Sequence, residues 1–110
     1  EEDTRKTLKI LLTKSGYKTI ECKNGKECLN KLVKIKPDLI ILDIVMPGMT
    51  GWQVISKIKA NPKTEEIPVF FLTGKTDEMS KSMGLKGAED YIEKPFDPYI
   101  LIKRINGFLK

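Results

Sequence analysis

The chain has 110 residues, the size of one domain, and its 40% apolar and 32% charged residues suit a folded globular protein rather than a disordered one. No apolar run approaches the length of a membrane-spanning helix, so no contact with a membrane is expected. The net charge of +5 comes from lysines spread over nearly every segment, which predicts a solvated surface rather than a nucleic-acid-binding patch.

The sequence contains no histidine and two cysteines, Cys22 and Cys28. Structural zinc sites need four ligands, so these cysteines are not expected to bind a metal ion. The lack of histidine also excludes histidine-based catalytic triads and phosphohistidine carriers. Free, reduced cysteines are expected, which suits a cytoplasmic protein.

The first third of the chain predicts a helix, a strand and a second helix. Three leucines follow an acidic start at helical spacing: Leu8, Leu11 and Leu12. Ser15-Gly16 should end this helix, and residues 18–22 predict a short strand. Asn24 can cap the second helix, which Lys36-Pro37 should stop. The apolar face of the second helix would hold Leu29, Leu32 and Val33.

Two continuous apolar runs dominate the middle of the chain, at residues 39–42 and 69–72. A strand without polar alternation is covered on both faces, which indicates a parallel sheet between helices. Thr50 can cap the helix between these runs, and Asn61-Pro62 should end it. The inner face of that helix would consist of Val54, Ile55 and Ile58.

The last third repeats the alternation of helix and strand. Residues 76–86 predict a helix with weak apolar periodicity, and Tyr91-Ile92 marks a short strand. Asp97 can cap a final helix with Pro98 at its first position. The apolar face of this helix would consist of Ile100, Leu101, Ile105, Phe108 and Leu109. The whole pattern predicts an α/β doubly wound parallel sheet in a single domain, with its chemistry at the carboxyl ends of the strands.

Three polar residues follow the three clearest strands: Asp43, Thr73 and Lys94. If the strands are neighbours, a carboxylate, a hydroxyl and an ammonium group converge at one edge of the sheet. A carboxylate can attack phosphorus, a lysine can neutralise the transferred group, and a hydroxyl can bind its oxygens. The same residues could instead be a turn cap, a strand-end threonine and a surface lysine, and fold logic alone leaves both interpretations open.

Three segments closely resemble the response-regulator receiver domains of two-component signalling. They are Asp43-Ile-Val-Met-Pro-Gly-Met-Thr-Gly51, Leu72-Thr73 after an aliphatic strand, and Asp90-Tyr-Ile-Glu-Lys-Pro-Phe96. The resemblance covers the whole chain. It implies the flavodoxin-like receiver fold of the CheY-like superfamily, with strand order 2-1-3-4-5.

The resemblance also implies a role for each site residue. Asp43 would accept a phosphoryl group from a histidine kinase, with Mg²⁺ or another divalent cation bound by Asp43 and the backbone carbonyl of Val45. Lys94 and Thr73 would contact the phosphoryl group. Thr73 and Tyr91 would form a conformational switch. Lys94-Pro95 is a candidate cis peptide, since X-Pro bonds adopt that form most readily.

The chain departs from the family pattern at its start. The family begins with a buried strand that ends in two acidic residues, which bind Mg²⁺ with the phosphoacceptor. By alignment from Arg5, Glu1 falls just after that pair, so the expected unit is a single receiver domain over 1–110 that lacks its first strand and is N-terminally incomplete. In an alternative register, Glu1 itself would serve as one metal-binding acid.

Three functions compete on this sequence. The first is a phosphorylation switch that changes one face to control a partner protein or output domain. This helix 4–strand 5–helix 5 face, in the family's numbering, consists of the helix at 76–86, the strand at Tyr91 and the final helix. It would assist its own phosphorylation and dephosphorylation without turning over external substrates, and a homodimer could form through that face. The second is a haloacid-dehalogenase-type phosphohydrolase, which needs a second Asp where Val45 stands. The third is a pseudo-receiver scaffold that is never phosphorylated.

Overall fold

The computed structural model describes residues 2–43, 48–74, 88–94 and 96–109. The chain divides into two compact units, which are described separately here. A helical unit comprises Glu1–Glu21 with Phe96–Lys110, and a sheet unit comprises Cys22–Pro95.

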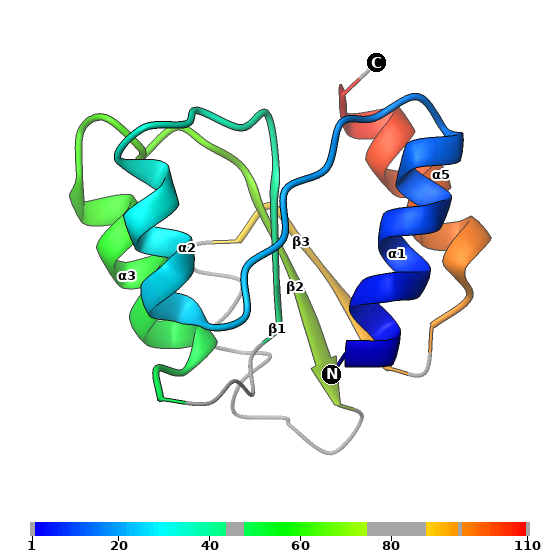
Figure 1. The fold of residues 1–110 in the computed structure, drawn as a ribbon, viewed down its shortest axis with the longest axis horizontal. Helices are drawn as coiled ribbons and strands as arrows, with labels where there is room; N and C mark the ends of the chain where they lie inside the picture. Colours follow the sequence, from blue (N-terminus) through cyan, green and yellow to red (C-terminus); the bar gives the residue numbers. More distant parts are fainter. Residues whose placement is uncertain (1, 44–47, 75–87, 95, 110) are drawn as a thin grey trace. The chain divides into compact units, whose positions relative to one another are not determined.

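The helical unit contains α1 (Glu2–Lys14) and α5 (Pro98–Leu109), which lie side by side (Figure 1). The predicted end of α1 at Ser15-Gly16 is confirmed. Gly16 has φ +93°, and the Tyr17 N–H donates to the Leu12 carbonyl at 3.0 Å. This arrangement satisfies a terminal helix carbonyl and favours glycine, which adopts positive φ without strain.

The start of α5 also follows the sequence prediction. Pro98 is its first residue, and the Asp97 carboxylate accepts a hydrogen bond from the Tyr99 N–H at 2.9 Å. The predicted apolar face was too wide, however. Leu101 and Ile105 are buried, whereas Ile100 is 53% exposed and Phe108 is 48% exposed.

The sheet unit holds three described strands in the order β1 (Ile40–Asp43), β2 (Val69–Gly74) and β3 (Asp90–Lys94). Both pairs of neighbours are parallel, and β2 lies in the middle. This is the parallel sheet that the apolar runs predicted, and its order matches the last three strands of the expected receiver sheet.

Residues 18–22 do not form the predicted strand, because no described strand pairs with them. A short alternating segment becomes a strand only when a neighbour accepts its backbone hydrogen bonds. The predicted helix at 76–86 lies outside the described residues.

Two helices, α2 (Gly25–Leu32) and α3 (Gly51–Ala60), cover one face of the sheet (Figure 1). Their caps confirm the sequence predictions: the Asn24 side chain accepts from the Glu27 N–H, and Thr50 forms a capping box with Gln53. Each such cap is worth about 1 kcal/mol.

The core between these helices and the sheet is apolar and includes the fully buried Phe71. Trp52 packs on Phe71 with ring centroids 5.1 Å apart. The buried members of this cluster are Cys28, Ile40, Leu42, Val54, Ile55, Ile58, Ile67, Val69 and Phe71. Val33, predicted on the inner face of α2, is instead 83% exposed, because the helix ends at Leu32.

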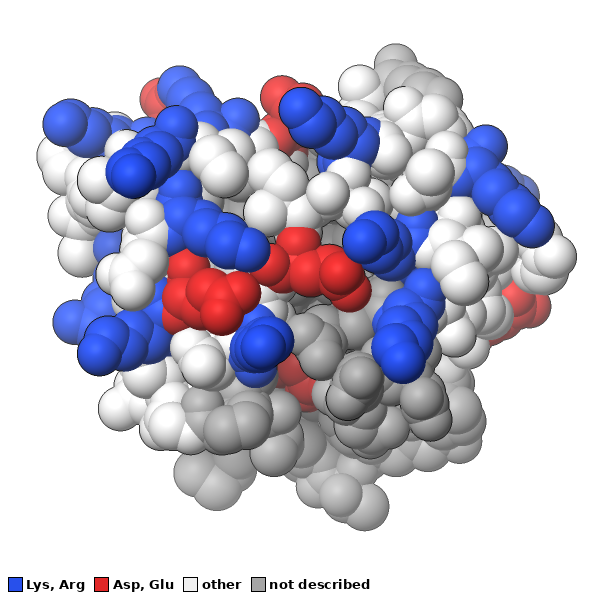
Figure 2. Space-filling view, in the orientation of Figure 1, with Lys and Arg blue, Asp and Glu red and all other residues white. Residues whose placement is uncertain are grey.

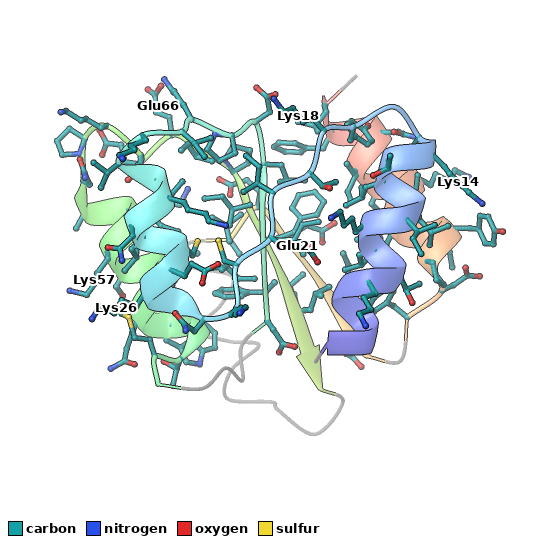
Figure 3. All side chains as sticks on the ribbon, viewed as in Figure 1. Lys14, Lys18, Glu21, Lys26, Lys57 and Glu66 are labelled. Carbon is teal, nitrogen blue, oxygen red and sulfur yellow. The ribbon has the colours of Figure 1, made fainter. Side chains whose placement is uncertain are left out.

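Most described lysines of the sheet unit are exposed. Lys26 on α2 and Lys57 on α3 point away from their helices (Figure 3). Both acidic and basic side chains are exposed on the face seen in Figure 2. In the described part of the chain, no helix combines the length and apolar character needed to cross a bilayer.

Candidate functional site

Asp43 is the last residue of β1, at the carboxyl end of the strand. Ile40 and Leu42, which precede it on the strand, are buried in the core. Asp43 itself is half-buried, so its carboxylate lies at the boundary between core and solvent. Gly48, after the apolar strand, has φ +81°, a conformation in which a side chain would be strained. The backbone at position 48 therefore favours glycine.

The register of the strands places the predicted residues at one edge of the sheet. Asp43 pairs with Leu72, and Lys94 pairs with Gly74, the last residue of β2. Strands lie about 4.8 Å apart and rise about 3.3 Å per residue. The backbone of Thr73 is therefore one strand and one residue from Asp43, and that of Lys94 is two strands and two residues away. The structure describes the backbones of Thr73 and Lys94, not their side chains.

Tyr91 lies nearer the middle of β3 and pairs with Phe71 on β2. It is half-buried and packs against the core cluster beneath α2 and α3. An aromatic ring in this position has one end in the core and one near solvent. Tyr91 is thus brought next to the core, rather than to the strand ends where Asp43 and Lys94 lie.

Three predicted site residues, Glu1, Val45 and Pro95, lie outside the described residues. Asp43 is therefore the one predicted metal ligand whose side chain is described. Within 2–43, 48–74, 88–94 and 96–109, no three acidic, histidine or cysteine side chains gather into a metal site. Mg²⁺ is commonly held by one or two carboxylates, with waters and phosphate oxygens completing its shell. A single carboxylate at the strand end fits that kind of site.

At the opposite edge of the sheet, Glu89 links the starts of β2 and β3. Its carboxylate accepts from the Val69 N–H at 2.7 Å, and its own N–H donates to the Val69 carbonyl at 2.9 Å. The ammonium of Lys59, at the end of α3, lies 3.6 Å from this carboxylate and donates to the Ile67 carbonyl. These bonds fix the register of β3 and hence the position of Lys94.

Sequence reasoning did not single out Glu89 or Lys59. Glu89 and Val69 are 20 residues apart, and no helical or strand spacing relates them. The only local signal was an acidic residue directly before a strand.

Comparison with known proteins identifies the family. Residues 1–106 match the family model of the response regulator receiver domain. The phosphate regulon transcriptional regulatory protein PhoB of Pseudomonas aeruginosa is 37% identical over 111 residues, which cover all of this chain and 48% of PhoB. Protein PilH of the same organism is 37% identical over 103 residues, 93% of this chain and 85% of PilH. The chain thus spans about half the length of PhoB and most of PilH.

Two solved structures share the fold closely. The receiver domain of a signal transduction histidine kinase from Syntrophus aciditrophicus has a TM-score of 0.91 at 34% identity, over 99% of this chain and 83% of that one. The chemotaxis response regulator CheY4 of Vibrio cholerae has a TM-score of 0.91 at 30% identity, over 99% and 92%. With its acidic strand end at the edge of a parallel sheet, this chain belongs to the family of response regulator receiver domains.

Proposed function

We propose that this chain is a phosphorylation switch in which Asp43 accepts a phosphoryl group from the phosphohistidine of a sensor kinase. The observation that carries the proposal is the register: Asp43 ends a buried strand at the same sheet edge as the backbones of Thr73 and Lys94. A carboxylate oxygen of Asp43 attacks phosphorus, the bond to the kinase's histidine nitrogen breaks, and an acyl phosphate remains on Asp43.

The residues around Asp43 take complementary roles in this proposal. The Lys94 ammonium neutralises the phosphoryl oxygens, and the Thr73 hydroxyl donates a hydrogen bond to one of them. The distance supports such a role for Lys94: two strand spacings and two residues together amount to about 12 Å between the backbones, within the combined reach of a lysine and a phosphorylated aspartate.

A divalent cation, Mg²⁺ by preference, would be held by Asp43 and the Val45 carbonyl, with Glu1 as an alternative acidic ligand. When bound, it neutralises negative charge on the transferred group. The chain's own part is to hold the Asp43 carboxylate at the solvent boundary, where a donor can approach it.

The signal would leave the site through Thr73 and Tyr91. A phosphoryl group on Asp43 attracts the hydroxyl of Thr73, and the vacated space allows the Tyr91 ring to bury more deeply. The half-buried position of Tyr91 against the core cluster supports this step. The helix 4–strand 5–helix 5 face then changes, and a partner protein, an output domain or a second copy reads it.

Two competing functions are weaker. A phosphohydrolase of the haloacid-dehalogenase type needs a general acid two residues after the nucleophile, where this chain has Val45. A pseudo-receiver scaffold would not need an acid, a hydroxyl and a lysine at the three strand ends. The names of the relatives support a regulatory output, since PhoB is a transcriptional regulator.

The proposal is tested by incubating the protein with acetyl phosphate and Mg²⁺ and measuring the intact mass. One phosphoryl group per chain is expected, and it should be lost in alkali, as acyl phosphates are. Omission of the divalent cation serves as the control and should leave the protein unmodified. If no adduct forms with the cation present, the pseudo-receiver function is favoured instead.

The switch is tested by NMR with beryllofluoride, a phosphoryl mimic, and Mg²⁺. Amide shifts are expected at residues 73–96 as well as around Asp43, because a ligand shifts a two-state equilibrium through its different contacts with the two states. Tyr91→Phe keeps the ring and should preserve most of these shifts. Shifts confined to the neighbours of Asp43 would contradict the coupling between Thr73 and Tyr91.

A further inference from the structure

The two cysteines lie together in the sheet unit, and the receiver chemistry at the strand ends uses neither. Both thiols are free. Cys28 is buried in the core cluster, and the half-buried Cys22 packs against that cluster. Each thiol affects the pKa of the other, as groups at close range do. A disulfide requires the two sulfurs to approach to a bond length of about 2.05 Å.

The cap of α2 explains how residues six apart in sequence come together. Asn24 adopts an extended backbone with φ −156° and ψ 175°, and helical geometry begins at Gly25. The Lys23 N–H donates to the Glu27 carboxylate at 3.4 Å, so the chain before the cap runs alongside the first turn of the helix. This places Cys22 next to Cys28, in the second turn of α2.

We propose that Cys22 and Cys28 form a reversible intramolecular disulfide by exchange with a low-molecular-weight disulfide such as oxidised glutathione. The Cys22 thiolate attacks one sulfur of the oxidant, which leaves a mixed disulfide and releases one thiolate. The Cys28 sulfur then loses its proton to solvent and attacks the Cys22 sulfur, releasing the second thiolate. Two cysteine thiols are oxidised, and one oxidant molecule is reduced to two thiols. The proposal does not depend on phosphorylation of Asp43.

Exposure assigns the two roles. Cys22 is the more accessible thiol, so it meets the oxidant first, and the buried Cys28 resolves the mixed disulfide. Burial raises the pKa of Cys22 above its usual value and raises the pKa of Cys28 to about 12. Lys31 of α2 opposes both shifts, whereas Glu27 adds to that of Cys22. Exchange should therefore be slow near pH 7 and about tenfold faster per pH unit as the Cys22 thiolate population grows.

The bond would close a ring around the cap of α2 and its contact with α3. Gly25, inside this ring, lies against Val54 and against Met49. Met49 belongs to the segment between Asp43 and α3. Oxidation would thus fix the part of α2 that supports the chain following Asp43.

The test is exchange of the native protein with oxidised glutathione, followed by intact-mass measurement. The wild type should lose two hydrogen atoms in mass, retain no glutathione, and return to its original mass with dithiothreitol. Cys28→Ala has no resolving thiol and should accumulate a glutathione adduct on Cys22. Cys22→Ser should stay unmodified unless denatured, because Cys28 is buried.

Far-ultraviolet circular dichroism checks that each variant is folded before exchange. If Cys28→Ala does not fold, the mass change of the wild type alone decides the test. A wild type that accumulates the glutathione adduct, forms disulfide-linked dimers or stays reduced at pH 9 would overturn the proposal. Exchange on Cys22→Ser without denaturant would overturn the assigned roles.

Discussion

Replacing Asp43 by asparagine is expected to abolish the phosphoryl adduct completely. Asparagine has nearly the same shape, but its neutral amide is not a nucleophile toward phosphorus. Because Asp43 is half-buried at the end of β1 and its neighbours on the strand are buried, the strand itself should form as before. The expected loss is therefore chemical, and the melting temperature should stay within a few degrees of the parent's.

The measurement is the intact mass after acetyl phosphate and Mg²⁺, with peptide mapping of the wild-type adduct. Asp38→Asn is the matched control, because it makes the same change at an exposed carboxylate just before β1. This control should be phosphorylated like the wild type. If Asp43→Asn forms as much adduct as the wild type, the assignment of the phosphoacceptor is wrong. If Asp43→Asn and Asp38→Asn both lose the adduct, the loss reflects a general effect of charge.

Most local signals for helix starts and ends predicted the structure well, because each depends on a few neighbouring atoms. The predicted stop at Lys36-Pro37 was wrong, since α2 already ends at Leu32. Asn24, Thr50 and Asp97 all cap helices in the structure, each through an oxygen that accepts from a backbone N–H two or three residues later. Such bonds need no information from distant parts of the chain. The position of Asp43 at the carboxyl end of a strand was predicted just as locally. A continuous apolar run marks a buried strand, and the charged residue that follows the run marks where the strand leaves the core.

Predictions that needed a distant partner were less reliable. Residues 18–22 have a strand-like pattern but no described neighbour to pair with, so the pattern alone was insufficient. Ile100 and Phe108 fit the period of a buried helix face, yet burial depends on what packs there. The register that aligns Lys94 with Gly74 was likewise not in the sequence, since it depends on contacts such as that between Glu89 and Val69.

Gly25→Ala is expected to destabilise the protein by about 1–3 kcal/mol, the usual cost of forcing an extra methyl group into a packed core. A Cβ at this position would lie 2.4 Å from Val54 Cγ2 and 3.1 Å from Met49 Cβ. Val54 has no solvent exposure, and a helical valine strongly prefers one rotamer, so its methyl group cannot rotate away. The two helices must separate to admit the new atom.

Helix propensity alone predicts the opposite sign. Gly25 is the first residue of α2, and alanine is favoured over glycine inside helices by up to about 1 kcal/mol. Gly107→Ala in α5 isolates that contribution, because a Cβ there meets nothing within 4 Å. The control should therefore be stabilised by about 0.5–1 kcal/mol. The two identical substitutions should differ in sign because one site is packed and the other is open.

Urea denaturation of both variants measures the difference, with the slope of the transition checked for constancy. By the usual scaling, each kcal/mol moves the melting temperature of a domain of this size by about 4–8 °C, so Gly25→Ala should melt well below Gly107→Ala. Gly16→Ala adds a third case, because its neighbourhood is open but its φ of +93° strains a side chain. It should be destabilised through the backbone alone. Equal stability of Gly25→Ala and Gly107→Ala would contradict the close packing of α2 against Val54.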